Sequence, residues 1–236
     1  MTTMTTGEKY AVLNMGEKLT RYQPVFDDLG PDAYHPAEQG GRTRRLAQYH
    51  AVYDPQTRRA DIVQLRTQLF LQGRTNKLTG SIERDFSALE ADMRAFIEAG
   101  FHAVDERWPL AGYQNEWMVN LHTVRVHAEP AVRGVPVPEG VHKDGADFVV
   151  MGCVARQDVK GGISQVHEND DEPPVYGVTL MPGDALVVDD REVFHMVTPL
   201  IAQSGHGYRD MILMGFHLWS HGKYRGDWKE QTVPTP

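Results

Sequence analysis

The stretch DFVVMGCVARQ, from Asp147 to Gln157, is apolar at consecutive positions in its middle and therefore on both of its faces. A strand of this kind is expected inside a sheet, with both faces covered. Other strand-like runs flank it, separated by short turns: WMVNLHTVRVHA, GGISQVHE, VYGVTL, ALVVDD, VFHMVTPL and YRDMILMGFHLW. Because no helical pattern lies between these runs, the sequence predicts a sandwich or barrel and not a parallel α/β sheet.

Upstream of these strands, the sequence predicts a hairpin and one helix. LAQYHAVYD (Leu46 to Asp54) alternates between apolar and polar residues, and VQLRTQLFLQ (Val63 to Gln72) has the composition of a second arm. SIERDFSALEADMRAFIEAG has apolar residues at helical spacing, with Ser81 as a candidate N-cap and Gly100 as a candidate stop. We expect this helix to back the sheet and residues 1 to about 10 to fray.

Composition excludes several classes of protein. The chain has 236 residues, enough for one domain with a large core over 1–236, and shows no convincing linker. Acidic residues outnumber basic ones by 32 to 24, and a surface of net charge −8 does not attract nucleic acid or anionic membranes. The basic cluster GRTRRL, from Gly41 to Leu46, is too short to change that expectation.

Membrane spans, a secretory signal and cysteines bear on the compartment in which a protein is expected. No apolar run reaches the roughly 18–20 residues that a membrane span requires, and MTTMTTGEKY at the N-terminus lacks the apolar segment of a secretory signal. The one cysteine, Cys153, can form neither an internal disulfide nor a thiolate metal cluster. We therefore expect a cytoplasmic protein, and the sequence leaves a homodimer open.

Immediately before the central strand, VHKDG places His142 and Asp144 two residues apart. Residues i and i+2 of a strand share a face, so the two side chains are either metal ligands or ordinary polar groups at the mouth of a strand. For any single one of the eleven histidines, the ordinary role has odds of about nine in ten. His142 has a stronger case because Pro136 and Pro138 stiffen its approach, and His195 in VFHMVTPL offers a third ligand.

Two imidazoles and one carboxylate would occupy one face of an octahedral metal and leave three positions open. Such a triad suits non-haem Fe(II), whereas a structural zinc site is closed by four ligands. The open positions fit a bidentate keto acid such as 2-oxoglutarate, whose far carboxylate needs a cation. Arg209, fourteen residues after His195, has the planar fork that matches a carboxylate. An exposed ion pair with Asp210 is the equally weighted alternative for Arg209.

The segments VHKDG, LMPGDALVVDD, VFHMVTPL and GYRDMILMGF together resemble the bacterial Fe(II)/2-oxoglutarate dioxygenases that hydroxylate free L-amino acids, the isoleucine hydroxylase group. The resemblance covers roughly residues 116–219, with a looser match in the hairpin and helix of residues 42–100. It implies a mainly β fold with flanking helices, a double-stranded β-helix (jelly roll, cupin-like). It further implies iron on His142, Asp144 and His195, with 2-oxoglutarate on Arg209. The implied reaction uses O₂ to hydroxylate a free L-amino acid or a close derivative and releases succinate.

Substrate contacts are less marked in the sequence. Thr123, Arg125 and His127 share one face of a predicted strand, and Arg125 is a candidate for the carboxylate of an amino acid or for the cosubstrate. The commoner role of such an arginine is a salt bridge on the strand. Ser164 and Gln165 are candidates for pocket lining, with an ordinary polar edge strand as the alternative.

Two other classes of function stay open. The chain lacks HExxH, GxSxG, GxxxxGK and GxGxxG, which removes the commonest protease, hydrolase and nucleotide-binding motifs. A non-catalytic jelly-roll binding protein would use the three candidate ligands structurally. A zinc-dependent jelly-roll protein would act without O₂ or 2-oxoglutarate. Iron-dependent formation of succinate separates the dioxygenase from both.

Overall fold

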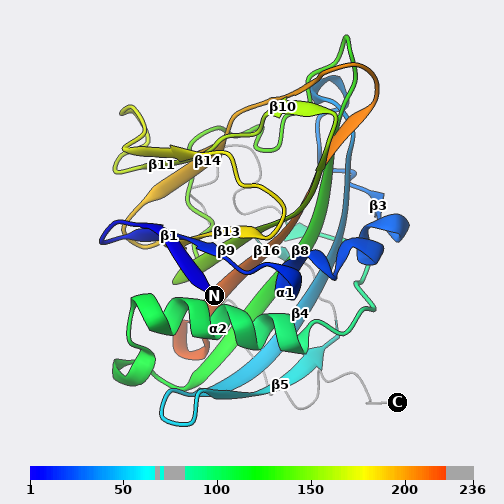
Figure 1. Ribbon diagram of the computed structural model, residues 1–236. Helices are drawn as coiled ribbons and strands as arrows, with labels where there is room; N and C mark the ends of the chain where they lie inside the picture. The colour runs from blue at the N-terminus through cyan, green and yellow to red at the C-terminus, as the bar shows by residue number, and fades with distance from the viewer. Residues whose placement is uncertain (67–69, 72–82, 222–236) are drawn as a thin grey trace.

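The computed structural model describes residues 1–66, 70–71 and 83–221, and most of its regular structure is β (Figure 1). The strands are β1 (Thr2–Thr6), β2 (Tyr10–Asn14), β3 (Gly30–Pro31), β4 (Arg42–Asp54), β5 (Arg59–Leu65), β6 (Phe70–Leu71), β7 (Glu83–Arg84), β8 (Glu116–Ala128), β9 (Phe148–Gln157), β10 (Val159–Gly161), β11 (Ser164–His167), β12 (Tyr176–Val178), β13 (Asp184–Asp189), β14 (Phe194–Val197), β15 (Leu200–Ala202) and β16 (Gly207–Leu218). The helices are α1 (Glu17–Thr20) and α2 (Arg94–Arg107), with short 3-10 turns η1 (Gln23–Asp28), η2 (Ala37–Gln39), η3 (Leu110–Gly112) and η4 (Trp219–His221).

The largest element is a nine-stranded antiparallel sheet with the order β1-β2-β13-β9-β16-β8-β4-β3, in which β5 also pairs with β4. Strand β9 lies between β13 and β16, so the prediction that it is central is confirmed. A small sheet of β12, β11 and β14 lies beside the large one in Figure 1. Side chains from both sheets line one pocket, which therefore lies between them.

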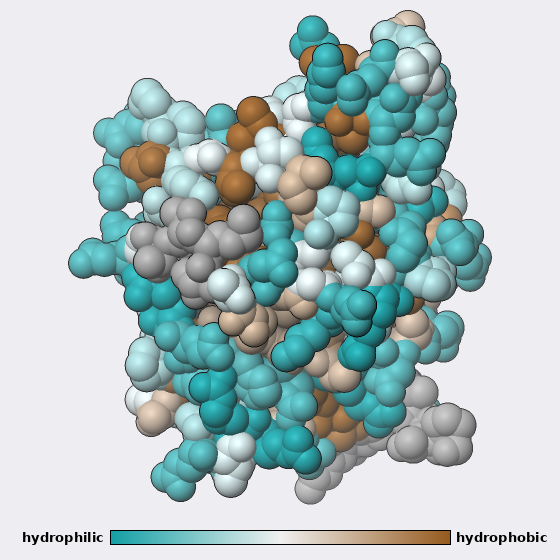
Figure 2. Space-filling view, in the orientation of Figure 1, coloured by the Kyte–Doolittle hydropathy of each residue, from teal (hydrophilic) through white to brown (hydrophobic). Residues whose placement is uncertain are grey.

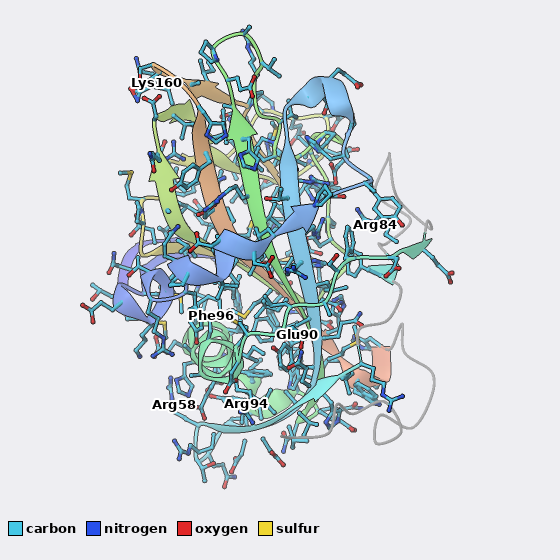
Figure 3. All side chains as sticks on the ribbon, turned by 90° about the vertical axis from the view of Figure 1, so that its right-hand side faces the viewer. Arg58, Arg84, Glu90, Arg94, Phe96 and Lys160 are labelled. Carbon is cyan, nitrogen blue, oxygen red and sulfur yellow. The ribbon has the colours of Figure 1, made fainter. Side chains whose placement is uncertain are left out.

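Helix α2 covers the other end of the large sheet and closes the main core (Figure 1). The ring of Phe101 on this helix packs against Trp117 of β8 and Phe216 of β16, with ring centroids 5.9 and 4.8 Å apart. Phe96 is fully buried, whereas the side chain of Arg94 is 54% exposed (Figure 3). The prediction that a helix in this region backs the sheet is confirmed.

The predicted bounds of that helix are wrong. It begins at Arg94, whose backbone N–H is capped by the Asp92 carboxylate at 3.0 Å, and it continues to Arg107. The preceding segment is extended instead, because it pairs with β4: the N–H of Leu46 donates to Ser87, and the N–H of Leu89 donates to Leu46. Ser81, the predicted N-cap, lies outside the described residues.

Gly100 lies inside α2 and does not end it. A Cβ atom at this position would lie 2.7 Å from Met214 Cε and 2.8 Å from Phe216 Cζ of β16. A side chain there would force Met214 and Phe216 or the helix to shift, since such contacts are shorter than van der Waals packing allows. The glycine therefore serves close packing of helix on sheet.

The predicted hairpin is confirmed as β4 and β5, joined by the turn at residues 55–58. The second arm lies earlier in the chain than predicted, from Arg59 to Leu65, and residues 67–69 and 72 of the predicted arm lie outside the described part of the chain. The expectation that the N-terminus frays is wrong, because β1 pairs with β2 and β2 extends the large sheet by pairing with β13.

The face shown in Figure 2 is mostly hydrophilic, with apolar residues in small separate groups. None of the helices in the described ranges combines the length and apolar composition that a bilayer span demands.

Candidate metal centre and its pocket

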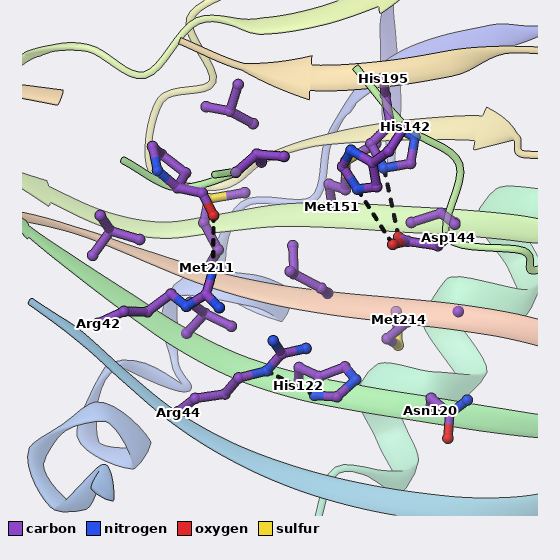
Figure 4. Close-up of a pocket in the computed structure, with 18 of the residues that line it drawn as sticks. Arg42, Arg44, Asn120, His122, His142, Asp144, Met151, His195, Met211 and Met214 are labelled. Carbon is purple, nitrogen blue, oxygen red and sulfur yellow. Dashed lines mark hydrogen bonds and ion pairs between the residues drawn. The ribbon is translucent and has the colours of Figure 1, made fainter. Parts of the chain in front are cut away.

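His142, Asp144 and His195 converge on one side of the pocket (Figure 4). One ligand atom from each lies within 4.8 Å of the others. The two carboxylate oxygens of Asp144 lie 3.5 Å from Nε2 of His142 and 3.5 Å from Nε2 of His195. Within the described ranges, no other three His, Cys, Asp or Glu side chains meet in this way. The arrangement supplies the two nitrogens and one oxygen of a facial triad.

The backbone brings the two histidines together. His142 and His195 form an antiparallel bridge, with N–O distances of 3.1 and 2.9 Å, and their ring centroids lie 4.5 Å apart. His195 lies on β14, as expected for a ligand on a strand. The expectation that His142 and Asp144 share a strand face is wrong, because both lie in the loop before β9.

Asp190 orders this loop, and sequence reasoning missed it. Its buried carboxylate accepts hydrogen bonds from the backbone N–H groups of Asp144, Gly145 and Ala146 at 3.2, 2.7 and 3.0 Å. The same carboxylate lies 3.5 Å from Nδ1 of His195. Partners of this kind fix the orientation of metal-binding imidazoles and raise metal affinity. The signal was present in ALVVDD, where Asp190 precedes His195 by five residues.

The electrostatics of the three side chains are coupled. Burial alone would raise the pKa of Asp144, but the imidazoles of His142 and His195 hold it well below its usual value. Burial likewise opposes the imidazolium of His142, yet the Asp144 carboxylate raises the pKa of His142 to about 9. Nδ1 of His142 lies 3.0 Å from the carbonyl oxygen of Gly140 and donates to it, which leaves Nε2 facing Asp144. A divalent cation would take the place of the protons shared here.

Arg209 lies on β16, is 2% exposed and lines the same pocket. Its terminal nitrogen donates to Ser164 Oγ at 3.2 Å, while its Nε has no hydrogen-bond partner among the described residues. The alternative pairing with Asp210 does not occur, because Asp210 is bound by Arg125. β16 pairs with β8 and β9 and not with β14, so Arg209 is not a strand neighbour of His195 as expected.

The structure does not bring Arg125 into the pocket. Pocket-lining residues of β8 are Asn120, His122, Val124 and Val126, which share the opposite face of the strand. Both arms of the Arg125 fork are held by Asp210, at 2.7 and 2.8 Å.

The two predicted pocket-lining residues on β11 also lie elsewhere. Ser164 contacts Arg209 and does not line the pocket. Gln165, on the other face of β11, packs near Gly177 of β12 and is outside the pocket as well.

Sequence reasoning also missed three pocket arginines, Arg42, Arg44 and Arg84. Arg42 and Arg44 come from the cluster GRTRRL, which was judged above only as too short to attract nucleic acid. Their spacing of two, just before the predicted strand of Leu46 to Asp54, was the available signal: β4 begins at Arg42, and this spacing places both arginines on one face. Arg42 pairs with Asp32 at 2.8 Å. Arg44 Nε donates to His122 Nδ1 at 3.0 Å (Figure 4). The cavity that these side chains help to enclose measures about 120 Å³.

Comparisons with known proteins bear on both the fold and the centre. The sequence matches a family model described as 2OG-Fe dioxygenase over residues 23–215. No curated protein matches the sequence.

Several solved structures are similar to this chain. A bsmA homologue from Methylobium petroleophilum PM1 has a TM-score of 0.73 and 25% identity over 90% of this chain and 89% of that one. IDO from Bacillus thuringiensis has a TM-score of 0.66 and 18% identity over 89% and 90% of the two chains. The Fe(II)/(alpha)ketoglutarate-dependent dioxygenase TqaL has a TM-score of 0.55 and 18% identity over 85% and 74%. The predicted mainly β jelly roll with flanking helices is confirmed.

Proposed function

The chain belongs to the 2OG-Fe dioxygenase family, and on that premise we propose that it hydroxylates a free L-amino acid or a close derivative. The predicted cofactors are confirmed at the level of the family, which uses Fe(II), 2-oxoglutarate and O₂. Bound iron supplies the oxidation of a substrate C–H bond, coupled to decarboxylation of 2-oxoglutarate to succinate. The chain's own residues hold, orient and enclose the reactants.

We assign the iron to His142, Asp144 and His195, and their convergence on a pocket that also holds Arg209 is the observation that carries the proposal. The donor set fits the ion, because two imidazole nitrogens and one carboxylate oxygen leave positions for a cosubstrate. Cys153 does not line the pocket, so no thiolate is placed there to close a structural zinc site.

Arg209 is proposed to bind the far carboxylate of 2-oxoglutarate. In the part of the chain that the structure describes, no carboxylate lies within ion-pair distance of this buried guanidinium. An unpaired buried charge is costly, and an anionic ligand would offset that cost. The Ser164 hydroxyl beside it can fix the orientation of the guanidinium.

A small zwitterionic substrate is supported by the size and charge of the pocket. A cavity of about 120 Å³ suits a small molecule and not a polymer. Among the described residues that line the pocket, the arginines are complementary to a carboxylate, and the carboxylate of Glu139 is complementary to an ammonium group. The acidic chain as a whole offers no attraction to nucleic acid.

The test is iron-dependent succinate formation in the alanine variants of the three ligands. His142→Ala, Asp144→Ala and His195→Ala are each expected to lose turnover and bound iron while staying folded, because each removes one of three protein ligands. Asp144→Glu is expected to fail as well, since the longer side chain misplaces the oxygen. His127→Ala, on the far face of β8, is the matched control and should keep both iron and activity.

Full activity in any one alanine variant would remove that residue from the centre. Zinc-dependent turnover without O₂ or 2-oxoglutarate would favour the zinc-dependent alternative, and tight metal binding without any turnover would favour the non-catalytic one. For the substrate, succinate is measured with each free L-amino acid and with the same residues capped at both ends. Equal turnover of free and capped forms would contradict recognition of the charged ends.

A further inference from the structure

Arg44 of β4 and His122 of β8 meet inside the pocket, on the wall that faces the three metal ligands (Figure 4). Nε of Arg44 lies 3.0 Å from Nδ1 of His122. A guanidinium offers only donors, so Nδ1 of His122 must be the acceptor and its ring proton must sit on Nε2. Burial and then the charge of Arg44 lower the pKa of His122 well below its usual value, which keeps the ring neutral. Arg44 thus fixes the tautomer of His122.

The Nε2–H group of His122 is a buried donor. The residue is 5% exposed, and Nε2 has no hydrogen-bond partner within residues 1–66, 70–71 and 83–221. Phe70 and Phe86 pack edge-on against the ring, with centroids 4.8 and 5.9 Å away, and hold its plane. A buried donor without an acceptor is unfavourable, so this position calls for an acceptor on a bound molecule.

Arg44 brings a positive charge to the same place. Its side chain is 10% exposed and its guanidinium stacks on Phe86, with Cζ 4.6 Å from the ring centre. Burial lowers the pKa of Arg44 to about 9, so the group keeps its charge at neutral pH. Asp32 compensates this charge only weakly, because its carboxylate lies 3.9 Å from Arg44 but 2.8 Å from Arg42. A cation and a fixed N–H donor side by side are complementary to a carboxylate.

This site is separate from the one at Arg209. In the sheet register, Arg209 lies opposite Val126, whereas His122 lies opposite Leu213. Arg209 and His122 are therefore four residues apart along the strands, about 13 Å at a rise of roughly 3.3 Å per residue. The Arg209 side chain turns to Ser164 of β11, whereas the His122 side chain turns to Arg44 of β4, so the two groups offer separate positions to an anion. The pocket accordingly has two anion-binding positions, and the cosubstrate anchor accounts for one of them.

We propose that Arg44 and the Nε2–H group of His122 bind the carboxylate of the substrate and so select substrates that carry a free acid. The inference rests on the proposed function, because it assigns one end of that substrate. With the acid held on this wall, the rest of the molecule points across the cavity toward the metal ligands. The apolar side chains of Val149, Met151 and Leu213 line the space between.

The test is calorimetric titration of the protein loaded with Fe(II) and 2-oxoglutarate without oxygen. The probes are the twenty free L-amino acids and their C-terminal amides, in which an uncharged carboxamide of similar size replaces the carboxylate. For the amino acid that binds most tightly, the amide is expected to bind about 10- to 150-fold more weakly, the range of a charge-assisted hydrogen bond.

Variants at the two positions locate the effect. Arg44→Met and His122→Phe are each expected to reduce the preference for acid over amide by about tenfold or more, while Arg44→Lys and His122→Gln keep part of it. Gln retains an acceptor for Arg44 and a donor for the ligand, which guards against a variant that merely misfolds. Arg45→Lys is the matched control, because the next residue of β4 faces outward and pairs with Asp28.

Several outcomes would overturn the assignment: no free amino acid binds, acids and amides bind alike, or Arg44→Met and His122→Phe keep the full preference. If those variants also lost affinity for 2-oxoglutarate, the claim that the two anion-binding positions are separate would be wrong. If acids are preferred in binding but no succinate forms in oxygen, the proposed function fails and the anion site stands. If succinate forms equally well with acids and amides, the dioxygenase stands and the anion site fails.

Discussion

The metal wall of the pocket (His142, Asp144 and His195) is positioned largely by backbone hydrogen bonds, whereas the arginine wall (Arg42, Arg44 and Arg209) is positioned by side-chain contacts. On the metal wall, backbone hydrogen bonds join the two histidines, and the buried carboxylate of Asp190 holds the loop that precedes β9. On the arginine wall, each guanidinium is held by a different side chain from another element. We therefore expect the geometry of the three proposed metal ligands to be independent of the arginines, so that substitutions on the arginine wall alter anion affinity and leave metal binding unchanged.

Among substitutions outside the three proposed metal ligands, the largest effect is expected on the arginine wall. Arg209→Ala removes the proposed anchor of 2-oxoglutarate and is expected to raise its KM by about 10- to 150-fold, the value of a charge-assisted hydrogen bond. The KM of Arg209→Lys for 2-oxoglutarate should lie between those of the unaltered protein and Arg209→Ala, because lysine keeps the charge but loses the two-pronged contact. Steady-state kinetics with varied 2-oxoglutarate measure both. An unchanged KM would place the anchor elsewhere and break the contrast between the walls.

A somewhat smaller effect is expected behind the metal wall. Asp190→Ala removes the acceptor of three backbone N–H groups and the carboxylate beside His195. Iron affinity is expected to fall by about 10- to 100-fold, as for other residues that orient metal ligands. Anaerobic competition against a chelator measures it, with Asp189→Asn, whose carboxylate binds Arg191, as the control. An unaltered iron affinity would show that the backbone bridge between His142 and His195 sets the ligand geometry without Asp190.

The smallest effect on catalysis is expected from Arg125→Ala. This residue lies on the face of β8 that turns away from the pocket, so the KM values for 2-oxoglutarate and substrate should change by less than about twofold. Stability should nevertheless fall by about 1.5–3 kcal/mol, because the buried Asp210 loses two charge-assisted hydrogen bonds. Denaturant unfolding measures that loss. A large rise in either KM with stability intact would return Arg125 to the site.

The convergence of His142, Asp144 and His195 could be predicted because its signals are local. His142 and Asp144 stand two residues apart, and His195 follows a strand and a turn in a run with strand character. The central position of β9 could be predicted because burial of both faces is visible as an unbroken apolar run. These features need only residue type and short spacing, and the loop before β9 did not have to be foreseen as a loop for its ligands to be found.

The meeting of Arg44 and His122 in the pocket could not be predicted in the same way. Arg44 and His122 are 78 residues apart and meet only through the pairing of β4 with β8. Which face of β8 looks into the pocket depends on register, and a shift of one residue exchanges the faces, as Arg125 illustrates. The start of α2 was missed because pairing with β4 draws the preceding segment into an extended form, against its helical spacing.

Strand β8 runs without interruption from Trp117 beneath α2 to Val126 in the pocket, paired along this length with both β16 and β4. Because this strand both lines the pocket and builds the main core, occupancy of the pocket is linked to the unfolding of the core. A molecule present at about a hundred times its Kd adds about 2.7 kcal/mol to the free energy of unfolding. The melting temperature of the protein thereby becomes a reporter of what fills its pocket, even before any chemistry has taken place.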